Sequence, residues 1–230
     1  MNRINFEDMI KVAQKLNSVD LDFVFIGGGI IGFLIDDPLA FPVRVTKDID
    51  VVLDILTDPG QIVLEEKLRA VGFYHDMSEN APRCRWCSDN VKVDILSIKD
   101  KFSGMNMKWL KETLEAPEKI EHKGYVFNVA SVPCFLAMKL EAFSDRGRSD
   151  YFGSRDIEDV VSVVDGRVSI VEEIRISDWK IINFISETIK KLLEIPDFVI
   201  SISGHLRPDP ASQQRKEIVI ERLNKISQLK

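Results

Sequence analysis

The chain has 230 residues and a mass of 26.2 kDa, enough for one large domain or two small ones around a hydrophobic core. Its composition, 45% hydrophobic and 30% charged, is that of an ordinary globular protein. The formal net charge of -6 argues against broad, non-specific binding to nucleic acid, although a local basic patch is compatible with it.

No segment has the pattern of a secretion signal or a membrane span. Residues 1–16 include acids and no apolar stretch. Residues 23–34, the longest nearly uncharged run, are too few and too rich in glycine to cross a bilayer. Cys84, Cys87 and Cys134 fit a reducing compartment, and the Cys84–Cys87 spacing lacks the second ligand pair of a zinc site. The sequence therefore predicts a soluble, cytoplasmic protein.

The first half of the chain alternates helical and strand-like patterns. Apolar spacing predicts helices over 6–16 and 61–71, and a short helix over 30–35 that ends before a proline. Period-two patterns and turn residues predict the following strands: 22–26, 49–53, a hairpin of 83–87 with 91–96, and a hairpin of 118–122 with 125–129.

From Ser131 onward the pattern becomes helical. Helices are predicted over 131–143, 155–164, 168–176, 179–193 and 216–228, with a turn-rich break over 196–214. We therefore expect an α/β (α+β) fold: a mixed sheet with helices in a domain over residues 1–130, followed by a C-terminal helical domain over residues 131–230.

Three features with chemical potential fall at predicted strand ends. Glycines 27, 28 and 29 follow the first strand, and a turn without side chains lets backbone N–H groups approach phosphate oxygens. Asp48 and Asp50, two residues apart on a strand, point to the same face, where their repulsion is relieved by a bound cation. Asp94 interrupts the apolar pattern of a third strand. Together these three acids are hard oxygen ligands suited to Mg²⁺ and to two-metal chemistry on phosphates.

Each feature also has an ordinary explanation. A tight turn accounts for the glycines Gly27, Gly28 and Gly29, which lack the spacing of a P-loop or a dinucleotide fold. Aspartates such as Asp48, Asp50 and Asp94 are common at solvated strand ends. The order and joint placement of the three features favour the functional interpretation.

The segments "FIGGGIIGFL", "RVTKDIDVVL" and "VKVDILS" resemble the polymerase-β-type nucleotidyltransferase superfamily. They are closest to its AbiEii-like branch, which includes the MenT-like type IV toxin nucleotidyltransferases. Arg44, Thr46, Asp48 and Asp50 match that branch's Arg-x-Thr-x-Asp-x-Asp motif residue for residue. The resemblance covers residues 23–165; it departs from the family pattern in its third glycine and in isoleucine following the glycines.

A downstream segment, "VASVPCFLAMKLEAFSDRGRSDYFGSRDIEDV", is similar to the family's lysine-bearing helix and its second acidic element. The resemblance implies that Lys139 binds the triphosphate and that Arg155, Asp156 and Asp159 form that element, with Asp156 at the nucleotide. Without the resemblance, Lys139 is a surface lysine whose stem lies along the helix, and Arg155 and Asp159 are an intrahelical ion pair. Arg146 and Arg148 are either a phosphate-receiving basic spot or a solvated loop.

The resemblance implies an enzyme of EC 2.7.7 type that moves a nucleoside monophosphate from an NTP, such as ATP, to an acceptor hydroxyl. Asp48, Asp50 and Asp94 would hold Mg²⁺ or Mn²⁺; the glycines, Arg44, Thr46 and Lys139 would bind the nucleotide. The acceptor is expected to be a tRNA 3′ end or a protein, in a toxin–antitoxin or phage-defence setting with a cognate antitoxin. A small-molecule acceptor and a non-catalytic nucleotide-binding module are the alternatives.

Overall fold

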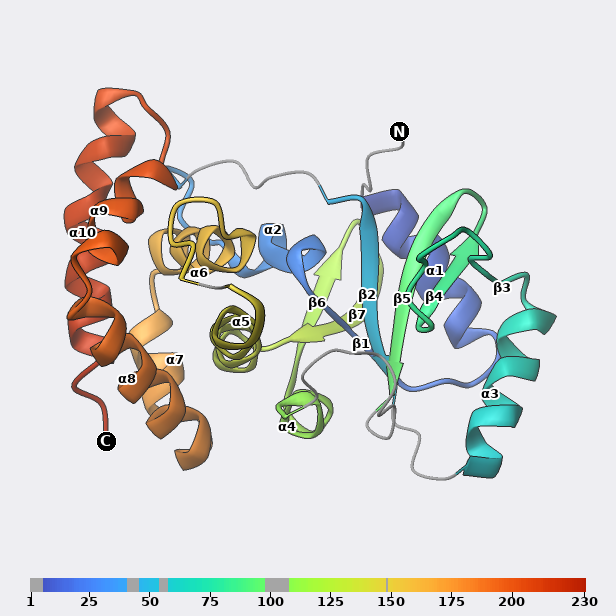
Figure 1. Cartoon of the computed structure of the whole chain (residues 1–230). Helices are drawn as coiled ribbons and strands as arrows, with labels where there is room; N and C mark the ends of the chain where they lie inside the picture. Colours follow the sequence, from blue (N-terminus) through green and yellow to red (C-terminus); the bar gives the residue numbers. More distant parts are fainter. Residues whose placement is uncertain (1–5, 41–45, 54–57, 98–107, 148) are drawn as a thin grey trace. The chain divides into compact units, whose positions relative to one another are not determined.

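The structure is a computed structural model that describes residues 6–40, 46–53, 58–97, 108–147 and 149–230 (Figure 1). The chain divides into two compact units. The first comprises residues 1–30 and 44–130, and the second comprises residues 31–43 and 131–230. The candidate carboxylates lie in the first unit, whereas Lys139 and Asp156 lie in the second.

The first unit is built on a mixed sheet, which confirms the predicted α and β architecture. Within the described residues the sheet has seven strands in the order β3-β4-β5-β2-β1-β7-β6. Its β2–β5 and β1–β7 pairs are parallel and the other pairs are antiparallel. The strands are β1 (Phe23–Ile26), β2 (Asp48–Leu53), β3 (Tyr74–His75), β4 (Arg85–Ser88), β5 (Val91–Ser97), β6 (Pro117–His122) and β7 (Tyr125–Ala130).

Both predicted hairpins are present, and their turns explain their registers. Asp89 and Asn90 have φ of 49° and 71°, and Lys123 and Gly124 have φ of 49° and 80°. Two consecutive residues with positive φ form the two-residue turn that matches the twist of an antiparallel pair. The first turn therefore pairs Ser88 with Val91, and every pair further along β4 and β5 follows from it.

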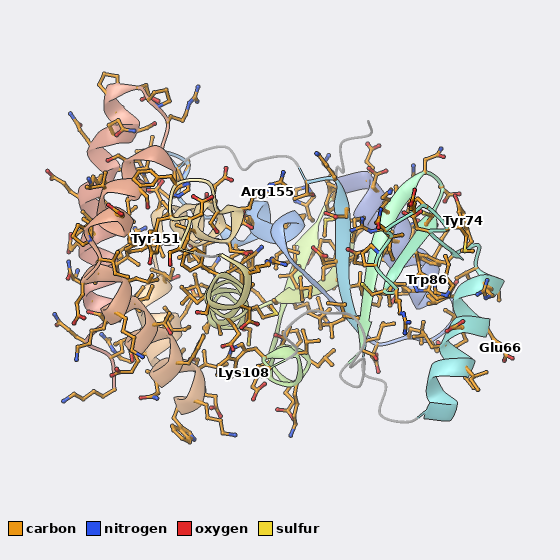
Figure 2. The ribbon with its side chains drawn as sticks, in the orientation of Figure 1. Glu66, Tyr74, Trp86, Lys108, Tyr151 and Arg155 are labelled. Carbon is orange, nitrogen blue, oxygen red and sulfur yellow. The ribbon has the colours of Figure 1, made fainter. Side chains whose placement is uncertain are left out.

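Helix α1 (Phe6–Asn17) lies on one face of this sheet. The Phe6 ring is 5.9 Å from the ring of Phe127 on β7, and the Lys15 ammonium donates to the Ser88 hydroxyl at 2.7 Å. On the same face as Ser88 lies the buried side chain of Trp86, which is labelled in Figure 2. The centroid of its ring is 3.7 Å from that of the His75 ring. Because side chains alternate along a strand, the neighbour of Trp86, Arg85, points to the opposite face. In the described part of this unit the other helices are α3 (Asp58–Ala70) and α4 (Leu110–Glu115), and a 3₁₀ turn, η1 (Gly28–Ile30), follows β1.

The second unit is helical, as predicted. Its helices are α2 (Ile31–Leu34), α5 (Val132–Arg146), α6 (Arg155–Gly166), α7 (Ile170–Arg175), α8 (Trp179–Leu193), α9 (Pro196–Gly204) and α10 (Pro210–Ile226). The segment that begins with α2 belongs to this unit, although the sequence places residues 31–43 in the first domain. The backbone N–H groups of Asp36 and Asp37 both donate to the Gly166 carbonyl at 3.0 Å, a long-range contact that local pattern does not encode.

Helix α9 and the start of α10 lie where the sequence predicts a break, so that prediction is wrong over most of 196–214. Pro196 stands at the first helical position, where a missing N–H costs nothing. Phe198 and Ile202, one turn apart, are fully buried. Helix α10 begins after Asp209, whose carboxylate caps the N–H of Ser212 at 3.0 Å.

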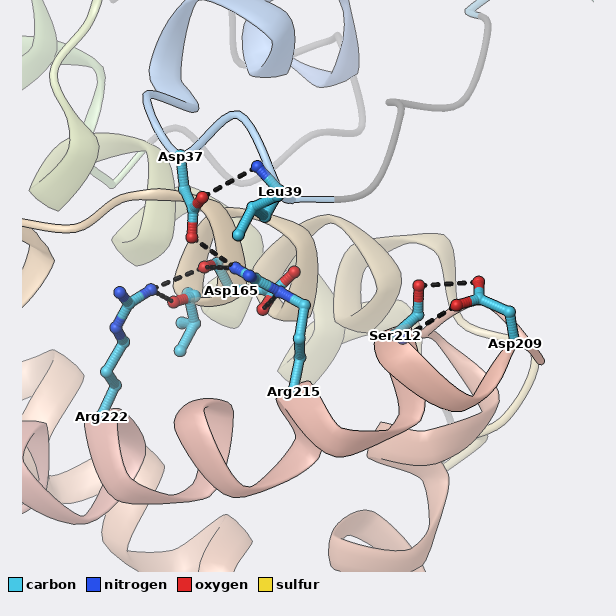
Figure 3. Close-up of polar contacts among 8 residues, drawn as sticks. Asp37, Leu39, Asp165, Asp209, Ser212, Arg215 and Arg222 are labelled. Carbon is cyan, nitrogen blue, oxygen red and sulfur yellow. Dashed lines mark hydrogen bonds and ion pairs between the residues drawn. The ribbon is translucent and has the colours of Figure 1, made fainter.

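A buried ion cluster joins α10 to α6 and to the segment after α2. Figure 3 shows the Arg215 guanidinium between two carboxylates: its Nε donates to Asp165 and its Nη2 to Asp37, both at 2.7 Å. Arg222 donates to the Asp165 backbone carbonyl at 2.6 Å. Burial raises the pKa of the Asp165 carboxyl even with Arg215 bound. This cluster therefore depends on Arg215 to compensate a buried charge.

Replacing Arg215 with Met should lower the free energy of unfolding by about 3–5 kcal/mol, because it leaves Asp165 buried without its counter-ion. Urea unfolding followed by circular dichroism measures this loss. Lys225→Met is the matched control on the same helix, because it removes only a surface ion pair with Glu221 and should cost less than about 1 kcal/mol. Equal losses in the two variants would contradict a structural role for the cluster.

Among the residues that the structure describes, no helix combines the length and the apolar character that crossing a bilayer requires.

Candidate active site

Two neighbouring strands, β2 and β5, bring acidic side chains together on the face of the sheet opposite α1, and β4 adds an arginine beside them. Asp50 on β2 is paired with Asp94 on β5, and Asp94 is paired with Arg85 on β4. Directly paired residues point to the same face, so these three side chains form a row across the sheet. Asp48 precedes Asp50 by two residues and shares its face. The strand pattern thus brings together the three acids that the sequence singles out.

The glycine turn contacts this row directly. Gly27 follows β1 with φ of 72°, in the left-handed region that favours glycine. A Cβ placed on Gly27 would lie 1.9 Å from Oδ2 of Asp50, a distance that no side chain can occupy. The absence of a side chain at Gly27 therefore makes room for the Asp50 carboxylate. This contact distinguishes Gly27 from Gly29, where an added Cβ would come near Thr46 instead.

Thr46 lies beside the third glycine of the turn. A Cβ placed on Gly29 would be 3.7 Å from the Thr46 hydroxyl oxygen, and Thr46 is 8% exposed. Gly28, between Gly27 and Gly29 in the chain, is buried in the 3₁₀ turn. The backbone of Gly27 to Gly29, Thr46 and the Asp50 carboxylate therefore lie close together. Arg44, which the sequence also places at the nucleotide, is outside the described residues.

Arg85 is the residue at this site that the sequence analysis missed. Its guanidinium binds Asp94 with two hydrogen bonds, from Nε to Oδ1 at 2.7 Å and from Nη2 to Oδ2 at 2.6 Å. The same Nη2 donates to Asp48 at 3.1 Å. Hydrogen bonds to Asp94 raise the pKa of Arg85, so the guanidinium stays charged.

The three carboxylates differ in how well they could serve as ligands of a divalent cation. Asp48 and Asp50 offer hard oxygen donors from one strand face, which fits one Mg²⁺ or Mn²⁺. Asp94 fits a third ligand less well, because both of its oxygens accept hydrogen bonds from Arg85. Within the described part of the chain, no group of three or more acidic, histidine or cysteine side chains is arranged to hold a metal. The donor set therefore suits one cation at Asp48 and Asp50.

Lys139 and Asp156 meet in a cluster inside the second unit. The Lys139 ammonium on α5 is 2.7 Å from Asp159 and 3.4 Å from Asp156, both on α6. The Asp159 side chain is 1% exposed and that of Lys139 is 12% exposed. Arg146, at the end of α5, donates two hydrogen bonds of 3.0 Å to Asp156. These pairs join α5 to α6, so a role of Lys139 on a triphosphate stays a prediction, as does that of Asp156.

The ion pairs of Asp156 with Arg146 and Lys139 make the free energy of unfolding depend on pH. Burial acts to raise the pKa of the Asp156 carboxyl, but Arg146 and Lys139 outweigh it and hold that pKa below its ordinary value of 3.8. A carboxyl whose pKa folding depresses stabilises the folded state above its unfolded pKa. That contribution is lost as the pH falls through the folded pKa.

Arg146→Gln should lower the free energy of unfolding by about 1 kcal/mol at neutral pH, a value that allows for the exposure of the guanidinium. The difference from wild type should shrink as the pH falls below 3.8, when Asp156 becomes protonated. Urea unfolding over a series of pH values measures it, with the surface variant Arg175→Gln as the control. A difference that persists undiminished at the acid end would contradict this assignment.

Comparison with protein-family models gave no match, and comparison with curated proteins gave none either. Among solved structures, the chain is similar to an antigenic nucleotidyltransferase-like protein from Paracoccidioides brasiliensis, with a TM-score of 0.49, 18% identity, and coverage of 88% of this chain and 95% of that one. It is also similar to ANT(2″)-Ia in complex with adenylyl-2″-tobramycin (TM-score 0.47, 14% identity, coverage of 80% and 95%). A third is JHP933 from Helicobacter pylori (TM-score 0.46, 13% identity, coverage of 95% and 87%).

Proposed function

We propose that this protein is a divalent-metal-dependent nucleotidyltransferase that moves a nucleoside monophosphate from an NTP to an acceptor hydroxyl. The observation that carries the proposal is the contact between the Gly27 turn and Asp50, in a row of acids that also holds Asp94. A turn without side chains beside paired carboxylates is what a metal-bound polyphosphate requires. The match of Thr46, Asp48 and Asp50 to the family motif supports the same activity.

Asp48 and Asp50 would hold the cation, which when bound would stabilise negative charge on the phosphate oxygens. The backbone of Gly27 to Gly29 would lie against the triphosphate, with the Thr46 hydroxyl beside it. Asp94 is the base that the site offers for the acceptor hydroxyl, once an oxygen is released by Arg85. The reaction joins the acceptor oxygen to the α-phosphorus, breaks the bond to the β-phosphate and releases pyrophosphate; the proton of the hydroxyl passes to the base.

The acceptor is proposed from the motif resemblance to be an RNA 3′ end, such as that of tRNA, or a protein hydroxyl. The toxin–antitoxin setting and a cognate antitoxin rest on the same resemblance. The formal net charge of -6 favours a small-molecule acceptor instead, since a polyanion is bound less readily by an acidic protein.

A non-catalytic nucleotide-binding module is a second candidate, which one observation favours. Both oxygens of Asp94 are occupied by Arg85, so the acid that would activate the acceptor is engaged in an ion pair. Such a module would bind a nucleotide through the Gly27 turn and Asp50 without releasing pyrophosphate.

Incubation with each of the four α-labelled NTPs, Mg²⁺ and total RNA, protein or small-molecule fractions tests the proposal. We expect label in one acceptor fraction with wild type and none with Asp48→Ala/Asp50→Ala. Label that appears equally with the double variant would exclude the carboxylate site. Nucleotide binding that needs the carboxylates, without pyrophosphate release in any fraction, would establish the binding module.

A further inference from the structure

Arg85 links two of the three acids of the candidate site, although nothing in the motif resemblance involves it. Its guanidinium contacts Asp94 through two hydrogen bonds and Asp48 through a third. The Asp94 side chain is 3% exposed, whereas those of Arg85 and Asp48 are 20% and 36% exposed. A carboxylate as buried as Asp94 requires a cation or hydrogen-bond donors beside it, and Arg85 provides both.

The position of the guanidinium has a consequence for metal binding. A divalent ion shared by Asp48 and Asp94 would compete with Nη2 of Arg85, which lies 3.1 Å and 2.6 Å from their oxygens. Of the contacts that Arg85 makes, a cation at Asp48 and Asp50 competes with the longer, more exposed one, to Asp48. A cation at Asp94, by contrast, must displace the charged fork of Arg85 from both carboxylate oxygens.

We propose that Arg85 is a built-in counter-ion that limits the nucleotide-free protein to one divalent cation, at Asp48 and Asp50. A second cation binds at Asp94 only after Arg85 releases it. Arg85 is thus a positioning residue that sets the order of metal binding. This inference rests on the proposed function, because it concerns the same carboxylates, but it makes a separate statement about the protein without nucleotide.

The sheet register makes this arrangement a built feature rather than a chance surface pair. Arg85 and Asp94 are directly paired across β4 and β5, in a register that the two-residue turn at Asp89 and Asn90 sets. Arginine is also the side chain whose planar fork binds both oxygens of one carboxylate at once. Lysine offers the same charge from a single point.

The test counts Mn²⁺ bound to the nucleotide-free protein, by titration with the electron paramagnetic resonance signal of free Mn²⁺. Wild type should bind one ion in the accessible concentration range. Arg85→Gln should bind a second ion, or bind Mn²⁺ more tightly by at least about tenfold, because the positive charge that opposes the metal is removed. Arg85→Lys, which keeps the charge and loses the fork, should lie between them.

Arg69→Gln is the matched control, since Arg69 belongs to the same unit but contacts Glu65 and the Trp86 ring. It should bind Mn²⁺ as wild type does. Circular dichroism checks that each variant is folded, and Arg85→Lys carries the test if the glutamine variant unfolds. Two ions in wild type, or the same number and affinity in wild type and both Arg85 variants, would overturn the inference.

The outcome is separable from that of the proposed function, because Mn²⁺ is counted without NTP or acceptor. If wild type transfers nucleotide and the Arg85 variants bind Mn²⁺ as wild type does, this inference alone is overturned. Mn²⁺ binding that is unchanged in Asp48→Ala/Asp50→Ala, with no transfer, would overturn the proposed function and this inference with it.

Discussion

Replacing Asp50 with Asn should lower the rate of nucleotidyl transfer on the order of 10³-fold. The amide keeps the shape of the side chain but removes the charge that would hold the cation, and metal stabilisation of phosphate charge is worth several kcal/mol. Asp50 is half-buried at one end of the row, beside Gly27 and paired with Asp94. Initial rates of label transfer at saturating NTP measure the effect.

Asp89→Asn is the control for the loss of one carboxylate from this unit. Asp89 lies in the β4–β5 turn, where Asn also tolerates its φ of 49°, and it pairs with Lys15 at 2.7 Å. That variant should transfer label within about twofold of wild type, since it loses only a surface ion pair. An Asp50→Asn protein that kept more than about a tenth of the wild-type rate would be incompatible with Asp50 as a metal ligand.

Gly27→Ala should abolish transfer and also destabilise the first unit. The added methyl would lie 1.9 Å from Oδ2 and 2.7 Å from Cγ of Asp50, at a φ of 72° that alanine adopts poorly. We expect a rate reduced at least about 100-fold and a free energy of unfolding lowered by about 1–3 kcal/mol, because both the carboxylate and the backbone must shift.

Two other glycines separate the causes of that effect. Gly124 has φ of 80° and nothing within 4 Å of an added Cβ, so Gly124→Ala isolates backbone strain. It should cost about 1 kcal/mol without changing the transfer rate. Gly29→Ala adds a methyl in ordinary contact with Thr46 and leaves Asp50 in place. If Gly27→Ala matched Gly124→Ala in both rate and stability, the contact with Asp50 would have no functional importance.

Part of the site, the shared face of Asp48 and Asp50, could be predicted from local rules. Alternation along a strand places Asp48 and Asp50 on one face, and the glycines that follow the first strand indicate a turn. Parallel pairing of β2 with β5, which brings Asp94 beside Asp50, is a long-range choice that pattern alone does not determine. The sequence grouped Asp94 with the other two acids only through the order and joint placement of the three features at predicted strand ends, without predicting this pairing.

The position of Arg85 beside Asp94 could have been predicted from the sequence, although it was not. A two-residue turn at Asp89 and Asn90 pairs residues outward from Ser88 and Val91, and counting along the hairpin places Arg85 opposite Asp94. The hairpin itself is predicted from the sequence, but its cross-strand pairs are not among the predictions. The sequence signal for Arg85 is therefore its position directly opposite Asp94 in the predicted hairpin.

Other features lay beyond local pattern. Residues 31–40 belong with the helical unit through backbone contacts with Gly166, far away in the chain. Helix α9 was hidden by a composition rich in serine, glycine and proline, and its helical state depends on the tertiary burial of Phe198 and Ile202. The partners of Lys139 on the next helix were likewise set by packing, which a pattern of charges at helical spacing does not reveal.

Following both ends of the triphosphate distinguishes nucleotidyl transfer from other phosphate chemistry. Wild-type protein is incubated with Mg²⁺, the acceptor fraction and the same NTP labelled either at the α-phosphate or at the γ-phosphate. Nucleotidyl transfer predicts α-label in the acceptor and γ-label released as pyrophosphate, both lost in Asp50→Asn. γ-Label in the acceptor, or release of inorganic phosphate with no α-label transferred, would contradict the proposed function.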